Sequence, residues 1–235
     1  MHHLVTPYRN RISLNLLCRR VPLHLALLLL IAPWSVHVQA DAQAGAKLAQ
    51  KGGAGILACM ACHGAKGEGQ AAAGFPRLAG QSQAYLEKQV REFASGQRVN
   101  PQMAPIASAL DAGQIKDVTD YYASLPEWKP AVPPDAAAPE YILGQKLATR
   151  GKWNEGMPAC FSCHATGGGG IPPHFPSIAG QPRAYTSGQL QSWQSSARSN
   201  DPQGLMKSVA SKLTAAEIAA VSLYLENPTQ PGKGK

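Results

Sequence analysis

The chain has 235 residues, of which 22 are Lys or Arg and 14 are Asp or Glu, and its formal net charge is +8. Four of the basic residues and none of the acidic ones precede residue 41, so the rest of the chain carries a formal charge of only +4. A surplus of this size is no argument for binding a polyanion, and we expect no nucleic-acid partner.

Residues 1–40 have the three-part layout of a secretory signal peptide. Arginines come first, an apolar stretch runs from Leu23 to Ile31, and Val38-Gln39-Ala40 offers modest side chains where a signal peptidase cuts. An uncleaved membrane anchor is the alternative, but it needs about 20 mainly apolar residues, and prolines and histidines shorten this run. We therefore expect cleavage after Ala40 and export to the periplasm, with peripheral membrane association left open.

Four of the five cysteines belong to one pattern that occurs twice. It reads Cys59-Met60-Ala61-Cys62-His63 and, later, Cys160-Phe161-Ser162-Cys163-His164. Cys-x-x-Cys-His is the attachment signature of c-type haem, because two thiols one helical turn apart can each add to a vinyl group on one porphyrin edge. The histidine that follows can then reach the iron. We predict two covalently bound haem c groups, with Cys59, Cys62, Cys160 and Cys163 as attachment residues and His63 and His164 as iron ligands.

The repeat extends beyond these motifs. Gly45-Ala46-Lys47-Leu48-Ala49 matches Gly144-Gln145-Lys146-Leu147-Ala148, and the segment 75–81 matches the segment 175–181. Between the copies lies a proline-rich connector without helical periodicity. We predict a signal peptide at 1–40, a first domain at 41–128, a linker at 129–139, a second domain at 140–228 and a flexible tail at 229–235.

Helical patterns dominate both halves, and no convincing alternating strand pattern is present. Ser82 can cap a helix with apolar residues at helical spacing, and Asp111 begins another. In the second half Thr214-Ala215-Ala216-Glu217 reads as a capping box. We therefore predict an all-α fold.

Aromatic and histidine side chains outside the motifs are expected to be structural or solvated. Trp153 and Trp193 are interpreted as packing residues. His174 is an alternative iron ligand, but we expect it to face solvent on a loop.

The iron ligand opposite each histidine follows by elimination among five methionines. Met103 lies 40 residues after His63, and Met206 lies 42 residues after His164, at equivalent places in the repeat. A lone methionine usually fills a core, but the pairing favours ligation. Histidine and methionine together give haem a relatively high potential and leave no open coordination position, so we expect no catalytic residues. The excluded methionines are Met1, Met60 and Met157.

These features resemble the dihaem class I cytochromes c of the cytochrome c4 family over nearly all of the chain after the leader. Both haem motifs, both Phe-Pro-x-(Leu/Ile)-Ala-Gly-Gln segments and both Arg-x-Asn segments before a methionine carry the resemblance. It implies two tandem class I cytochrome c domains, each wrapped around one covalent haem.

By this resemblance several further residues would surround the haems. Pro76 and Pro176 would lie beside the histidines, with a backbone carbonyl orienting each imidazole, and Leu78 and Ile178 would pack on the haem. Arg98 and Arg198 would either bind propionates or be solvated. The segment from Asn100 to Met103 is shorter than that from Asn200 to Met206, a departure that could give the haems unequal potentials.

The resulting hypothesis is a periplasmic carrier of single electrons between redox proteins, such as a quinol-oxidising membrane complex and a terminal oxidase. One alternative is the haem-carrying electron-transfer subunit of a larger dehydrogenase. Another is a dihaem enzyme, a peroxidase or a thiosulfate-oxidising cytochrome, which would need an open or unusual axial position. A zinc or dithiol role for the cysteines explains neither the histidines nor the leader.

Overall fold

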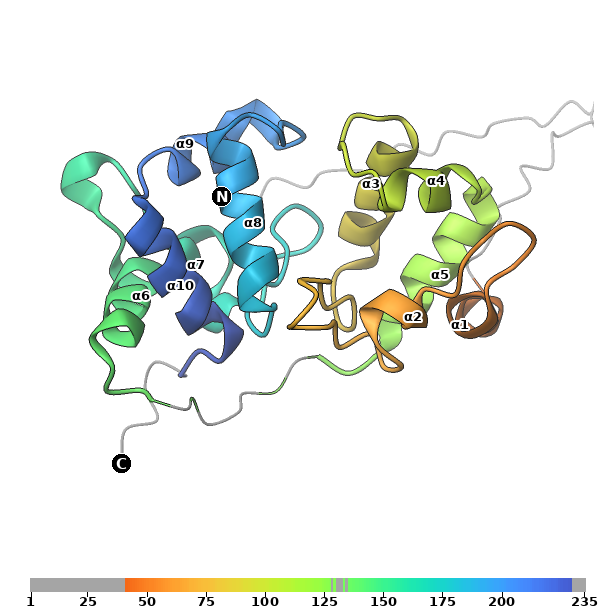
Figure 1. Cartoon of the computed structure of the whole chain (residues 1–235), viewed down its shortest axis with the longest axis horizontal. Helices are drawn as coiled ribbons and strands as arrows, with labels where there is room; N and C mark the ends of the chain where they lie inside the picture. The colour runs from red at the N-terminus through yellow and green to blue at the C-terminus, as the bar shows by residue number, and fades with distance from the viewer. Residues whose placement is uncertain (1–40, 128, 130–132, 134, 230–235) are drawn as a thin grey trace, which may run out of the picture. The chain divides into compact units, whose positions relative to one another are not determined.

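The structure is a computed structural model that describes residues 41–127, 129, 133 and 135–229 (Figure 1). The predicted signal peptide, part of the predicted linker and nearly all of the predicted tail lie outside the described residues. The described residues belong to one compact unit, so that the contacts between its two halves are part of the fold.

The first half is built from five helices. The Asp41 carboxylate accepts hydrogen bonds from the Gln43 and Ala44 amides and begins the first helix. Asp111 forms a capping box with Gln114, as its position predicts, whereas Ser82 precedes a helix without a side-chain cap. The helices are α1 (Ala42–Lys51), α2 (Met60–His63), α3 (Gln83–Ala94), α4 (Met103–Ser108) and α5 (Ala112–Ser124).

The second half repeats this order. The predicted capping box of Thr214 and Glu217 is confirmed at the start of the last helix. Over the described residues, extended backbone pairs only as isolated bridges, and the all-α prediction is confirmed. The α-helices are α6 (Pro139–Arg150), α7 (Cys160–Cys163), α8 (Arg183–Gln194), α9 (Leu205–Ala210) and α10 (Ala215–Glu226), joined by the short 3-10 turns η1 (Trp153–Glu155), η2 (Thr166–Gly168) and η3 (Pro202–Gly204).

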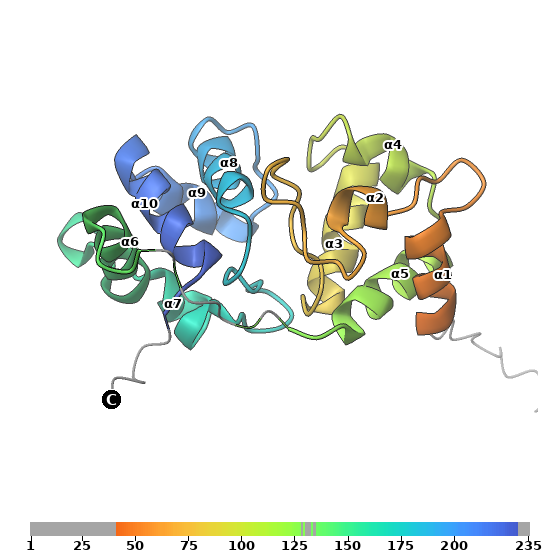
Figure 2. The same cartoon turned by 60° about the horizontal axis from the view of Figure 1, so that its bottom comes forward.

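Each core forms where the first helix of a half crosses the last one, α1 with α5 and α6 with α10 (Figures 1 and 2). A glycine makes each crossing close: a Cβ at Gly45 would lie 2.0 Å from the Asp117 carbonyl oxygen. The buried side chains around these crossings include Leu48, Ile56, Leu86, Val118 and Tyr122 in the first half and Tyr141, Leu147, Met157, Ile218, Val221 and Tyr224 in the second.

The tryptophan prediction holds for one residue and is wrong for the other. Trp193 packs against the second core, but Trp153 is 65% exposed. Trp153 follows Lys152, whose backbone pairs with Met157 and whose ammonium contacts Glu155 and Glu217. This short hairpin buries Met157 and carries the indole outward.

Within the described part of the chain, none of the helices combines the length and apolar character needed to cross a membrane.

Candidate haem-binding sites

Each Cys-x-x-Cys-His motif folds as one turn of helix. The His63 amide donates to the Cys59 carbonyl (2.9 Å), and the corresponding bond in the second motif is 3.0 Å long. Residues at i, i+3 and i+4 share one helix face, so both thiols and the imidazole of a motif point to the same side. Cys59, Cys62, Cys160 and Cys163 form no disulfide with one another. Burial raises the pKa of the Cys59 thiol, and it raises the pKa of Cys160 to about 11.

Both motif histidines are buried and held by a carbonyl. His63 Nδ1 lies 2.9 Å from the Pro76 oxygen, and His164 Nδ1 lies 2.8 Å from the Pro176 oxygen. Burial lowers the pKa of both imidazoles, and the hydrogen bond to the carbonyl opposes this only in part. A neutral imidazole that donates through Nδ1 keeps the Nε2 lone pair free, which is the form that binds a metal.

The two candidate methionines begin short helices and are half-buried. Met103 is the first residue of α4, and the Asn100 side chain accepts from its amide (2.8 Å). Met206 is the second residue of α9, and there the Asp201 carboxylate accepts from the Lys207 amide (3.0 Å). An asparagine side chain thus binds a first-turn amide in the first half, and an aspartate side chain does so in the longer second segment.

Two of the remaining predicted side chains pack on the cores, and the alternative histidine ligand does not. Leu78 and Ile178 are half-buried and pack against the first and second core. His174 is exposed, as expected for a loop residue.

Arg98 and Arg198 are buried, at 7% and 6% exposure, so neither is a solvated surface residue. Arg98 donates to Gln89 (2.7 Å) and Gln189 (2.8 Å). Arg198 donates to the same two amide oxygens, at 3.1 Å and 2.7 Å. These two guanidinium groups share neutral amide oxygens, and the nearby buried Glu92 carboxylate is paired with Lys88. Positive charge therefore remains for an anionic group, and haem propionates fit that requirement.

The sequence interpretation did not identify the glutamines that organise this region. Gln81, Gln89 and their counterparts Gln181 and Gln189 are all buried or half-buried. Each glutamine of the first half recurs 100 residues later in the second half, and this repetition could have marked them in the sequence as structurally important.

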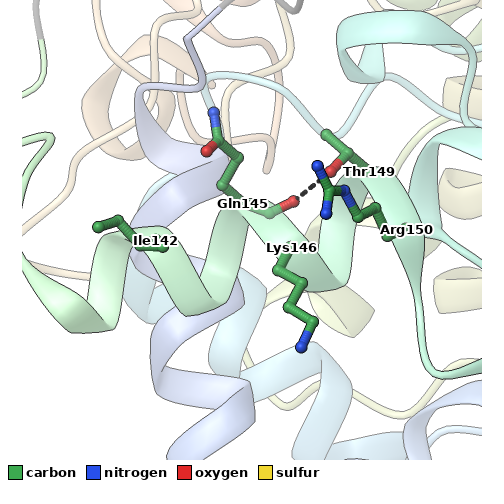
Figure 3. Close-up of a pocket in the computed structure, with 5 residues that line it drawn as sticks. All are labelled: Ile142, Gln145, Lys146, Thr149 and Arg150. Carbon is green, nitrogen blue, oxygen red and sulfur yellow. Dashed lines mark hydrogen bonds between the residues drawn. The ribbon is translucent and has the colours of Figure 1, made fainter.

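A surface hollow lies elsewhere, on the outer face of α6. Figure 3 shows its five lining side chains projecting from that one helix, with the Thr149 hydroxyl donating to the Gln145 carbonyl (2.7 Å). It contains no residue of either haem motif and no predicted iron ligand.

Comparison with known proteins identifies the family. The cytochrome c family profile matches residues 42–126 and 142–228. The thiosulfate dehydrogenase electron acceptor of Thiomonas intermedia (strain K12) is 46% identical over 178 residues, which are 74% of this chain and 81% of that protein.

Two solved structures share the fold. A thiosulfate dehydrogenase from Marichromatium purpuratum superposes with a TM-score of 0.74 at 40% identity over 81% of this chain, which spans only 40% of that longer chain. Reduced cytochrome c4 from Pseudomonas stutzeri superposes with a TM-score of 0.70 at 33% identity over 80% of this chain and 99% of its own.

Two haem c groups, one per domain, supply iron that alternates between the ferrous and ferric states. The chain is a dihaem class I cytochrome c of the cytochrome c4 family, an electron carrier with one covalent haem in each half.

Proposed function

We propose that this cytochrome accepts electrons from a thiosulfate-oxidising dehydrogenase and passes them on to a further redox protein. The observation that carries the proposal is the match to proteins named for that role: the Thiomonas acceptor is 46% identical, and the same fold forms 40% of a thiosulfate dehydrogenase chain. A carrier between a quinol-oxidising complex and an oxidase is the second candidate, favoured by the cytochrome c4 relatives.

The proposed coordination supports transfer rather than catalysis. Cys59 and Cys62 would attach the first haem, and His63 and Met103 would bind its iron. The second half would use its equivalent residues, Cys160, Cys163, His164 and Met206. With His63, Met103, His164 and Met206 as ligands, protein side chains would occupy the positions on iron that a substrate needs, which favours electron transfer over a dihaem peroxidase or a thiosulfate-oxidising enzyme.

The test mixes the oxidised holoprotein with thiosulfate and a catalytic amount of purified thiosulfate dehydrogenase, and follows haem reduction by stopped-flow absorbance. We expect both haems to be reduced over successive turnovers of the dehydrogenase, at a rate proportional to the amount of dehydrogenase. Omitting the dehydrogenase is the control, because reduction by thiosulfate alone would identify the chain itself as the enzyme. Reduction only by a quinol-oxidising complex would favour the second candidate.

We also propose that the protein works in the periplasm after cleavage at Ala40. Covalent haem attachment takes place outside the cytoplasm, and the leader pattern supports export. Mass spectrometry of the secreted protein should show a chain that begins at Asp41 and carries the added mass of two haems. A cytoplasmic, full-length form would contradict this proposal.

A further inference from the structure

Two glutamines at matching positions of the repeat each bind a backbone segment of the opposite half, and the two segments bound are equivalent in the repeat. The Gln181 amide accepts from the Arg77 N–H (3.0 Å) and donates to the Arg77 carbonyl (3.0 Å). The Gln81 amide accepts from the Ser177 N–H (3.1 Å) and donates to the Ser177 carbonyl (2.7 Å). Both glutamines are buried, with 3% and 5% exposure for Gln81 and Gln181. Each therefore fixes one residue of the opposite half through both of its backbone groups.

The peptides held in this way also hold the motif histidines. The Arg77 N–H and the Pro76 carbonyl are the two ends of one planar peptide unit, and that carbonyl lies 2.9 Å from His63 Nδ1. The second half repeats the arrangement, with 2.8 Å between Nδ1 of its histidine and the carbonyl that precedes Ser177. Each peptide accepts a hydrogen bond from a histidine of its own half and donates one to a glutamine of the other half.

Hydrogen bonds at the two ends of a peptide strengthen each other. An acceptor at the N–H increases the negative charge on the carbonyl oxygen, a cooperative gain of roughly 10–30% per bond. A stronger acceptor at Nδ1–H makes the imidazole more basic at Nε2, as is known for groups behind metal-bound histidines. A more basic ligand favours ferric over ferrous iron and lowers the reduction potential.

We propose that Gln81 and Gln181 are crossed positioning residues, each of which lowers the reduction potential of the haem in the half to which it does not belong. Gln181 acts on His63 and Gln81 acts on His164, each through the peptide that it holds. The inference rests on the proposed ligation of iron by these two histidines. If the two glutamines act in this way, the contact between the halves influences the reduction potentials of both haems.

The test replaces each glutamine by methionine, which has a similar length but no amide. In the holoprotein, Gln181→Met is expected to raise the potential of the first-half haem alone. Gln81→Met is expected to raise that of the second-half haem alone. A redox titration followed by NMR resolves the two haems, and contacts with the Phe161 ring, which only the second motif contains, assign them.

Gln83→Met is the matched control. The Gln83 side chain makes its hydrogen bonds within the first half, to Glu87 (3.0 Å) and Thr119 (3.4 Å), so this variant should change neither potential. A second readout is the Nδ1–H proton of His63, whose NMR signal should shift toward that of a weaker hydrogen bond in Gln181→Met and stay in place in the control.

Several outcomes would overturn the proposal. If both haem potentials shift equally in each variant, the glutamines only hold the halves together. If the potential shifts only for the haem in the half that carries the substitution, each glutamine acts on its own half and the proposal is wrong. If Gln181→Met does not retain haem, Gln181→Glu is the fallback variant, because a carboxylate keeps an oxygen that accepts from the Arg77 N–H. On this proposal Gln181→Glu must lower the reduction potential of the first-half haem more than that of the second-half haem. A spectrum without low-spin histidine ligation in the unaltered protein would instead defeat the ligand assignment of the proposed function.

Discussion

Gly144 lies where α6 crosses α10, and its replacement by alanine should destabilise the second half. An ideal Cβ at this position would lie 2.1 Å from the Ala220 carbonyl oxygen and 2.8 Å from Tyr224 Cβ. Both atoms are fixed parts of α10 rather than ends of flexible side chains. The two helices must therefore move apart by about 1 Å before ordinary contact is restored, since a packed core cannot absorb the methyl group.

Two opposing contributions set the size of this effect. Alanine favours a helix over glycine by about 1 kcal/mol. Forcing a methyl group into a filled contact costs about 1–3 kcal/mol, and more where backbone must shift. A gap of about 1 Å also removes up to about half of the dispersion energy between the facing side chains. Subtracting the gain in helix propensity from the upper end of the overpacking cost, we expect Gly144→Ala to lower the free energy of unfolding by about 2 kcal/mol net.

Guanidinium unfolding of the holoprotein, followed by far-ultraviolet circular dichroism, measures this loss. Gly188→Ala is the matched control, because Gly188 lies within α8 and a Cβ added there would have no atom within 4 Å. This variant should gain about 1 kcal/mol from helix propensity alone. Equal stabilities of the two alanine variants would refute the close crossing of α6 and α10.

Three further predictions concern ligation, acid stability and the contact between the halves. Met103→Ala and Met206→Ala should each remove half of the near-infrared band of methionine-ligated ferric iron, and an intact band in both variants would disprove the ligand assignment. Burial opposes ionisation of Glu217, but hydrogen bonds from the Thr214 cap and Lys152 lower its pKa overall, so Lys152→Met should cost up to about 1 kcal/mol. This carboxylate contribution is present above its ordinary pKa and lost as pH falls through the lowered one, so unfolding curves of the variant and the unaltered protein should converge in acid. Arg77→Met should cost about 1–3 kcal/mol in the same assay, because it leaves two buried backbone carbonyls without their donor.

Local signals in the sequence located the starts of three helices, α3, α5 and α10. Asp111 and Thr214 each begin a helix with a capping box because the partners of a cap lie three residues along the chain. Ser82 shows the limit of the same signal: it stands at the right position, but its hydroxyl makes no cap bond. A cap residue therefore locates a helix start better than it predicts the bond itself.

Features that depend on how distant segments pack were not predictable in the same way. The sequence left Arg98 and Arg198 equally open to solvent or propionates. In the structure both are buried, and each donates to a glutamine of the opposite half. Trp153 was expected to pack because indoles usually do, yet the direction of its hairpin exposes it. Gln81 and Gln181 repeat visibly, but their crossed bonds require the two halves to be placed against each other.

The two halves of the chain are alike where their residues repeat, but some of the residues that contact the opposite half are not repeated. The buried Arg77 guanidinium reaches the Ala179 carbonyl (2.9 Å), whereas serine stands at the equivalent place in the second half. Glu92, also in the first half, accepts from the Asn200 side chain (2.6 Å), while the equivalent Asn100 accepts from the amide of the first candidate methionine. Arg77 and Glu92 are thus a buried cation and a buried carboxylate that the second half does not repeat, whereas Arg98 and Arg198 are buried in both halves. Because charges act more strongly in a low-dielectric interior, this one-sided pair is a physical reason for two nearly identical haem sites to differ in potential.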